Sequence, residues 1–245
     1  MLLPVAISHP LLIPVGNASD WTGPTGNNTW LLTGREPALV DAGTGLPSHV
    51  DAVAQALAGA PLVRVLITHW HPDHVSGLPA LKARWKDLAV VESGTAPVPA
   101  GDSMLEIVPT PGHAPDHLCF FDRESGDLYC GDLARLGGTI VIPVSKGGDL
   151  RAYLASLQRV RDLAPRRLLP GHGPIVDDPI ALIDDYLAHR AQREQQILKA
   201  MLEGARTVAD IVSRVYPALP ASLSDAAAES VRAHLVKLRD EGRSS

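Results

Sequence analysis

The chain has 245 residues, of which 45% are hydrophobic, 20% charged and only 4% aromatic, a composition ordinary for a globular protein whose core is built from Leu, Val, Ile and Ala. The formal net charge is −5. Residues 1–150 carry eight basic and fifteen acidic side chains, and residues 151–245 carry fourteen basic and twelve acidic side chains. Neither part has the strong basic excess that is typical of a nucleic-acid-binding domain.

The N-terminal segment MLLPVAISHPLLIPV is apolar, but it has no basic opening and no small-residue cleavage site. We therefore expect irregular chain and a first strand rather than a signal peptide. No run of about 18 apolar residues is present, so no membrane span is expected. The two cysteines, Cys119 and Cys130, are too few for a disulfide framework, and we expect both to be buried free thiols in a cytoplasmic protein.

Short apolar runs alternate with Gly, Pro and Asp as far as about residue 175. Strands are predicted within 29–34, 37–43, 62–69, 88–93, 103–113, 117–122, 127–134 and 166–174. Helices are predicted at 47–59, 77–85 and 149–163, where apolar residues recur at helical spacing. The first two strands and the pair 117–122 and 127–134 read as hairpins. Segment 138–143 reads either as a further strand or as the lining of a pocket.

The character of the sequence changes near residue 178. Three helices are predicted, at 178–204, 207–217 and 224–242, the second beginning with a Thr-x-x-Asp capping pattern. We therefore expect a catalytic domain of residues 1–177 and a small C-terminal helical domain of residues 178–245.

The segment THWHPDHVSG (68–77) brings three histidines and an aspartate directly after a predicted buried strand. Imidazole nitrogens and carboxylate oxygens form the usual ligand shell of Zn²⁺. Without a metal, clustered imidazoles repel one another when protonated and lose hydration without compensation. The spacing therefore predicts one metal on His69 and His71 and a second on Asp73 and His74.

Each pair needs a further ligand. Three residues at other strand ends are candidates, although each is a weak signal alone: His113, Asp132 and His172. His117 is either a supporting residue or an ordinary strand residue. The other histidines are expected to be exposed or capping residues: His9, His49, His189 and His234.

Four motifs, THWHPDHVSG, TPGHAPDH (110–117), LYCGDL (128–133) and LLPGHGP (168–174), resemble in order the metal-binding segments of the metallo-β-lactamase superfamily. The resemblance implies an α/β (α+β) fold, namely an αββα sandwich with a dinuclear metal site. It also implies a ligand set: His69, His71 and His113 on one metal, Asp73, His74 and His172 on the other, and Asp132 bridging the two. Two Zn ions are expected, and Fe or Mn would accept the same ligands.

The tail segments YLAHRAQREQQIL (186–198) and VRAHLVKLRDEGR (231–243) resemble the C-terminal region of the branch that contains beta-lactamase-like protein 2, where endoribonucleases are described. That region is commonly a winged helix, but the sequence stops two residues after EGR, so we expect a short or absent wing. A bridging aspartate, as implied for Asp132, resembles the metal site of glyoxalase II, the lactonases and the RNA-processing members of the superfamily, whereas true metallo-β-lactamases lack it. β-Lactam hydrolysis is therefore expected only as a weak side activity.

These patterns predict a metal-dependent hydrolase in which a hydroxide bridging two metals attacks an ester, thioester or lactone-like acyl group. Asp73 is expected to orient this hydroxide and pass on a proton besides acting as a ligand. One alternative is an endoribonuclease or phosphodiesterase; another is a nucleic-acid-binding regulator with a vestigial metal site. The expected partner is a small-molecule substrate, with RNA as the alternative and no membrane, and the chain is expected to be a monomer or homodimer.

Supporting roles are expected for three further features. Asp41, in VDAG, would orient an imidazole, or else bond to its own backbone in a turn. GGTIVIPVSKGG (137–148) would line the substrate pocket, where Lys146 either meets an anionic substrate or remains solvated. TGPTGNN (22–28) lacks the spacing of a phosphate-binding loop and would form a mobile loop over the site or a plain connection.

Overall fold

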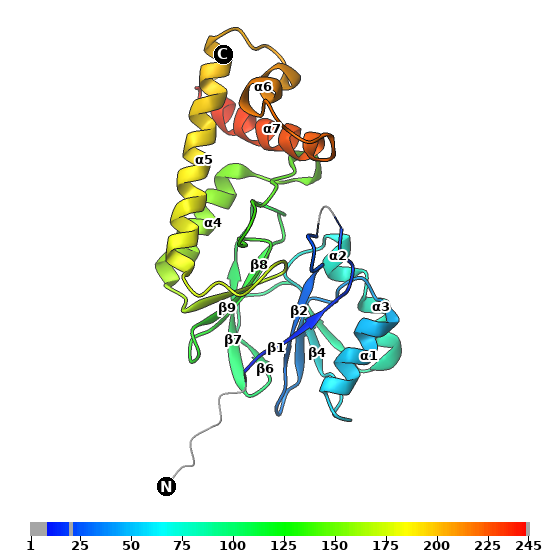
Figure 1. Cartoon of the computed structure of the whole chain (residues 1–245). Coiled ribbons are helices and arrows are strands. Elements are labelled where there is room, and N and C mark those ends of the chain that lie inside the picture. Colours follow the sequence, from blue (N-terminus) through cyan, green and yellow to red (C-terminus); the bar gives the residue numbers. More distant parts are fainter. Residues whose placement is uncertain (1–8, 20–21, 244–245) are drawn as a thin grey trace.

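Two five-stranded sheets face each other, with helices on both outer sides (Figure 1). The computed structural model describes residues 9–19 and 22–243. The strand order is β1-β2-β3-β4-β5 in the first sheet and β10-β9-β8-β7-β6 in the second. The expected αββα sandwich is confirmed.

The first sheet comprises β1 (Leu11–Pro14), β2 (Asn28–Leu32), β3 (Ala38–Val40), β4 (Arg64–Leu66) and β5 (Ala89–Val91). The strands β1, β2 and β3 pair antiparallel, whereas β3, β4 and β5 pair parallel. Parallel strands end at the same edge of a sheet, so the loop after β4 begins at this shared edge.

The second sheet comprises β6 (Val98–Ala100), β7 (Ser103–Pro109), β8 (Leu118–Asp122), β9 (Asp127–Gly131) and β10 (Arg167–Pro170). The strands β8 and β9 form the expected hairpin, and β10 joins β9 in parallel. The sequence pattern did not predict β6. This strand contains Pro99, which cannot donate to a ladder, and it is tolerated because β6 lies at the edge of the sheet.

Three apolar layers hold the sandwich together. Between the sheets lie side chains such as Trp30, Leu66, Phe120 and Tyr129. On the outer face of the first sheet, α1 (Pro47–Ala56) and α3 (Leu78–Arg84) bury their apolar sides, and the one-turn helix α2 (Pro72–Val75) precedes α3.

The second sheet is covered by α4 (Leu150–Leu163), as Figure 1 shows. The predicted apolar face of this helix is confirmed, since Leu150, Leu157 and Val160 are buried and Leu154 is partly buried against them. Residues 138–143 form no strand. They continue into the 3₁₀ turn η1 (Val144–Lys146), which precedes α4.

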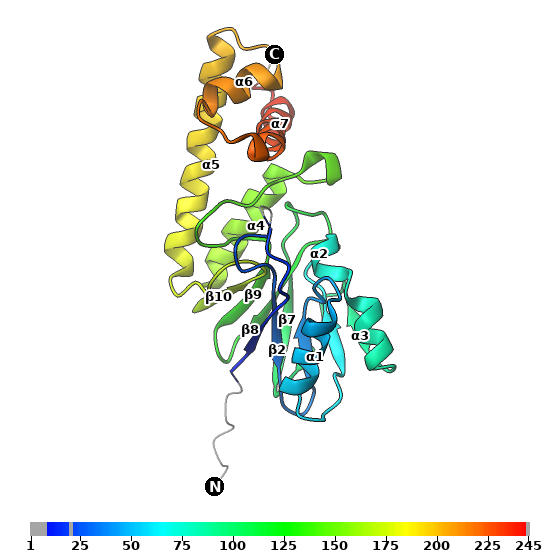
Figure 2. The same cartoon turned by 45° about the vertical axis from the view of Figure 1, so that its right-hand side comes forward.

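The C-terminal helices are α5 (Pro179–Leu202), α6 (Val208–Val215) and α7 (Ser224–Asp240), with the 3₁₀ turn η2 (Ala221–Leu223) before α7. Figures 1 and 2 show α5 running along α4 and on to α6 and α7. Accordingly Ile183 and Tyr186 join the core of the second sheet, whereas Ile197 and Ala200 join the core of the tail. The domain boundary at 177/178 stays a prediction, and α5 contributes to both cores.

No strand occurs among the described residues 207–243, and the short or absent wing stays a prediction. Among the described residues, no helix combines the length and the apolar character that crossing a membrane requires. Most of the predicted N-terminal irregular chain, residues 1–8, lies outside the described residues.

Candidate metal centre

The seven predicted ligands meet at the edge of the sandwich where the strands end. The loop after β4 carries His69 and His71, and α2 carries Asp73 and His74. The loops that follow β7, β9 and β10 supply the remaining three: His113, Asp132 and His172. Pro72 begins α2, and this single helical turn directs Asp73 and His74 to the same side of the centre.

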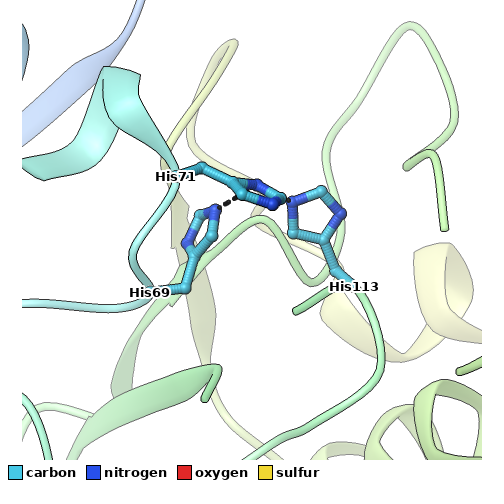
Figure 3. Close-up of side chains that lie close together, drawn as sticks. All are labelled: His69, His71 and His113. Carbon is cyan, nitrogen blue, oxygen red and sulfur yellow. Dashed lines mark hydrogen bonds between the residues drawn. The ribbon is translucent and has the colours of Figure 1, made fainter. Parts of the chain in front are cut away.

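One group consists of His69, His71 and His113, each of which offers one ring nitrogen, and these three nitrogens lie within 4.8 Å of one another (Figure 3). The Nδ1 atom of His71 is 3.0 Å from His69 Nε2 and 2.9 Å from His113 Nε2. An imidazole nitrogen carries either one proton or one lone pair, so Nδ1 cannot serve both contacts at full strength. A cation between the three nitrogens would satisfy all of them.

A second group consists of Asp73, His74 and His172, also with ligand atoms within 4.8 Å of one another. Asp132 lies between the two groups. Its Oδ1 is 3.6 Å from His74 Nε2 and 3.3 Å from His172 Nε2, and its Oδ2 is 3.5 Å from His113 Nε2. Each carboxylate oxygen of Asp132 therefore faces one of the two groups.

The donor set fits divalent cations. Asp132 Oδ1 is buried and has no hydrogen-bond partner among the described residues; the ring nitrogens of His172 and His74 lie 3.3 and 3.6 Å away. A divalent cation at this position would compensate for the burial of the carboxylate. All seven candidates offer imidazole nitrogen or carboxylate oxygen, the ligands that Zn²⁺, Fe and Mn accept. The role of each residue as a ligand nevertheless stays a prediction.

Hydrogen bonds behind the cluster set which nitrogen of each imidazole faces the centre. His74 Nδ1 donates to Asp41 Oδ2 over 2.7 Å, so Nε2 faces inward. His113 Nδ1 donates to the carbonyl oxygen of Val141 over 2.7 Å. Thr68 donates its hydroxyl proton to Asp41 and accepts from His69 Nδ1 at 3.1 Å. Such outer contacts fix the tautomer and raise the basicity of the inward nitrogen.

Asp41 occupies the position that the sequence suggested for an imidazole-orienting residue. It is buried, lies just after β3 and has a φ of 63°, a left-handed conformation that is uncommon for residues other than glycine. Its Oδ1 accepts from the backbone N–H of Thr68 over 2.8 Å. This network ties the first sheet to the candidate ligand His74.

Three residues that support the candidate ligands were not predicted from the sequence, or their role was left open. Asn27, in the Gly-rich segment 22–28, is buried and donates to Asp73 Oδ2 over 2.9 Å. His117 accepts from the backbone N–H of Asp132 over 3.1 Å and so positions that residue. Gly171 is required by space, because a Cβ there would lie 2.8 Å from His74 Cε1. The tandem asparagines of GNN were a usable signal, since buried amides need partners.

Protonation divides the cluster in two. Burial lowers the pKa of His69 and of His113. It also lowers the pKa of His71, to about 4, so all three imidazoles are neutral and have lone pairs to offer. In the other group burial lowers the pKa of His172, but the carboxylates of Asp132 and Asp73 together outweigh burial and raise this pKa to about 9. A metal on this side would displace a proton, as metals on imidazole do.

Two further expectations concern the surroundings of the centre. Lys146, in η1, is exposed, and its charge helps to lower the pKa of His71, so it lies within electrostatic reach of the cluster. Segment 22–28 reaches the cluster through Asn27, which pairs with His172 in an isolated β-bridge. Its mobility stays a prediction.

The expectation that His49 and His234 are exposed or capping residues is wrong. Each side chain is only 1% exposed. His49 lies four residues before the buried Val53 on α1 and bonds to Thr29 Oγ1 over 2.8 Å. His234 lies three residues after Val231, on the buried side of α7. Helical spacing would have revealed both.

Comparison with known proteins identifies relatives of the whole arrangement. Residues 22–104 and 90–172 match the model of the metallo-beta-lactamase superfamily, and residues 207–244 match that of the beta-lactamase associated winged helix domain. A beta-lactamase-like protein 2 homolog of Drosophila melanogaster is 33% identical over 89% of this chain and 84% of its own length. An atrochrysone carboxyl ACP thioesterase of Aspergillus chevalieri is 33% identical over 83% of this chain and 72% of its own length.

Among solved structures, a metallo-beta-lactamase family protein of Thermus thermophilus superposes with a TM-score of 0.77. The match covers 95% of this chain and 94% of that one at 24% sequence identity, and it shows a shared fold. The C-terminal helices are therefore part of the common architecture and not an addition peculiar to this sequence.

Proposed function

Because this chain belongs to the metallo-beta-lactamase superfamily and is one of its hydrolases, we propose that it cleaves a small acyl substrate, such as an ester, thioester or lactone, at a dinuclear zinc centre. The observation that carries the proposal is the position of Asp132 between two groups of three ligands, with one oxygen toward each. Two groups of donors joined by one carboxylate would hold a pair of divalent metals.

When bound there, the metals would supply Lewis acidity toward the acyl oxygen and would make water reactive near neutral pH. The chain's own residues would do the rest. Asp73 is the candidate that holds and passes on a proton, because its side chain is 30% exposed and thus open to the substrate side. Asn27 would keep Oδ2 of Asp73 directed inward.

Residues beside the centre favour a small acyl substrate. Trp70 lies between His69 and His71 in the sequence and is 52% exposed, so the loop that carries two candidate ligands also carries an accessible apolar side chain. Lys146 offers a cation for an anionic portion of the substrate. The relative named as a thioesterase supports placing thioesters first among the acyl classes. β-Lactam hydrolysis would be a weak side reaction.

The endoribonuclease alternative has one observation in its favour, the match of residues 207–244 to a winged helix domain. The basic residues of that region are largely neutralised, however. Lys237 and Arg243 both pair with Glu194, and Arg232 pairs with Glu229. RNA binding needs unpaired cations along a surface, so the acyl hydrolase is the better supported function. A regulator with a vestigial site would not need all seven inward-facing donors.

The test is a substrate panel on metal-quantified protein. Acyl thioesters, nitrophenyl esters, lactones, a β-lactam and single-stranded RNA are assayed with the zinc-loaded chain and with His74→Ala. We expect thioester or ester hydrolysis that falls about 1,000-fold in His74→Ala, together with loss of metal. His9→Ala, at an exposed histidine just before β1, serves as the control and should retain both.

RNA cleavage without acyl hydrolysis would replace the proposal with the nuclease. Fewer than two metals per active chain would remove its dinuclear part. A cytoplasmic location and the choice between monomer and homodimer stay predictions from the sequence.

A further inference from the structure

The three histidines of the first group come from both sheets. His69 and His71 lie in the loop after β4, which belongs to the first sheet, whereas His113 follows β7 of the second sheet. The contacts of His71 Nδ1 with the other two imidazoles therefore depend on how these two loops are held against each other (Figure 3). Residues 67–71 belong to no helix or strand, so the position of this loop depends on bonds to its neighbours.

Two hydrogen bonds join the loop after β4 to the start of β8 and the loop before it. The backbone N–H of Leu118 donates to the carbonyl oxygen of Thr68 over 2.7 Å. Two residues further along the loop after β4, the backbone N–H of Trp70 donates to Asp116 Oδ2 over 2.9 Å. The spacing is that of an antiparallel ladder, with the carboxylate of Asp116 in the place of a backbone carbonyl. The candidate ligand His69 lies between these two bonds.

Asp116 belongs to the same closed loop as His113. The base of this loop is fixed by the backbone N–H of Thr110, which donates to the carbonyl oxygen of His117 over 2.9 Å. The bond from Trp70 to Asp116 has a carboxylate as its acceptor, and hydrogen bonds to ionised groups are roughly twice as strong as neutral ones. Asp116 therefore ties the loop that carries one histidine of the first group to the loop that carries the other two.

We propose that Asp116 is a positioning residue for one of the two metals. Through Trp70, it holds the loop of His69 and His71 against that of His113, so that one cation can bind all three imidazoles. This inference rests on the proposed dinuclear centre and adds which residue sets the affinity of one of its metals. The second group has hydrogen bonds of its own, such as that donated by Asn27 to its aspartate, so the effect of Asp116 falls on the first group.

The test is zinc binding to the full chain in competition with a chelator of known affinity, which gives the affinity of each binding step. In Asp116→Ala we expect one step to weaken about ten-fold or more and the other to stay near its native value, since losing an outer partner costs about 10- to 100-fold in metal affinity. Asp116→Asn should restore the weakened step, because its amide oxygen still accepts from Trp70. In a His71→Ala background, which removes the first site, Asp116→Ala should have no further effect.

Asp102→Ala is the matched control. Asp102 is half-buried like Asp116, and its Oδ1 accepts from the backbone N–H of Arg35 over 3.1 Å. It lies just before β7, at the opposite end of that strand from the loop that carries His113. This variant also loses a carboxylate that accepts from a distant backbone N–H, but it should leave the affinity of both zinc steps unchanged.

A measurement on the metal-free chain tests the loop contact itself. Amide hydrogen exchange at Trp70 should be at least about ten-fold faster in Asp116→Ala than in the native chain or in Asp116→Asn. Unchanged exchange at Trp70, native zinc affinity in Asp116→Ala, or equal weakening of both steps overturns the proposal. A native chain that binds a single zinc, weakened in Asp116→Ala, supports the proposal but removes the dinuclear part of the proposed function.

Discussion

Replacing Asp41 by Asn tests whether the hydrogen-bond network behind the cluster prepares it for metal. In the native chain Asp41 Oδ2 accepts from His74 Nδ1 at 2.7 Å. An amide NH₂ in that place is a donor, so Nδ1 must become the acceptor and the ring proton must move to Nε2. This nitrogen faces Asp73 Oδ2 and Asp132 Oδ1, each 3.6 Å away, and a protonated Nε2 cannot bind a metal.

The expected loss of metal affinity follows from the number of hydrogen bonds that Asp41→Asn alters. The Asn carbonyl can still accept from Thr68, whose N–H and hydroxyl bond to Oδ1 at 2.8 and 3.0 Å. Asn also tolerates the φ of 63° at this position. Only the bond to His74 is reversed, and losing one such outer partner costs about 10- to 100-fold in metal affinity, or roughly 1.4–2.7 kcal/mol.

The assay is competition for zinc with a chelator of known affinity, followed by metal content and by the rate of thioester hydrolysis. Asp122→Asn is the matched control, because Asp122 is also buried and accepts from Ser103 at 2.9 Å, but lies on β8 away from the cluster. It should alter stability without altering zinc affinity. Equal zinc affinity in Asp41→Asn and the native chain would refute the argument that this bond selects the tautomer.

Two further outcomes are expected. Gly112→Ala should destabilise the chain by about 3 kcal/mol, because its Cβ would lie 2.3 Å from Tyr153 Cα, whereas Gly59→Ala, which meets nothing within 4 Å, should cost about 1 kcal/mol in urea unfolding. His234 has a pKa of about 3 when folded and 6.5 when unfolded, so its contribution to stability is present above pH 6.5 and is lost as the pH falls toward 3. Between pH 7 and pH 4 the free energy of unfolding should therefore fall by up to about 3 kcal/mol more in the native chain than in His234→Gln. Parallel pH profiles of unfolding would contradict the buried neutral state of His234.

The strands and helices around the centre were predictable because their patterns are local. The strands β4, β7 and β9 are each followed within four residues by a polar side chain that a core would reject, namely His69, His113 and Asp132, and this is visible without a structure. The spacing of His69, His71, Asp73 and His74 predicted a metal site directly. The pairing of the remaining candidate ligands came from the family resemblance, since strand order cannot be read from periodicity.

The supporting residues were less accessible because their partners are distant in sequence. Asn27 meets Asp73 across 46 positions, and Thr68 joins Asp41 across 27. Such contacts depend on which strands are neighbours. A buried histidine on a helix is different: His49 and His234 share helical spacing with apolar residues, so their burial could have been inferred.

The division of the chain at residue 177 illustrates a limit of composition-based reasoning. The turn-rich segments give way to helices there, but α5 buries Ile183 and Tyr186 in the core of the second sheet before it buries Ile197 and Ala200 in the tail. The hydroxyl of Tyr186 bonds to the backbone of Arg135 and Gly138, and Arg190 bonds to that of Ile140. Because these bonds hold the segment that orients His113, α5 supports the candidate metal centre as well as the tail. A change at the buried face of α5 should therefore affect metal binding as well as the stability of the C-terminal helices.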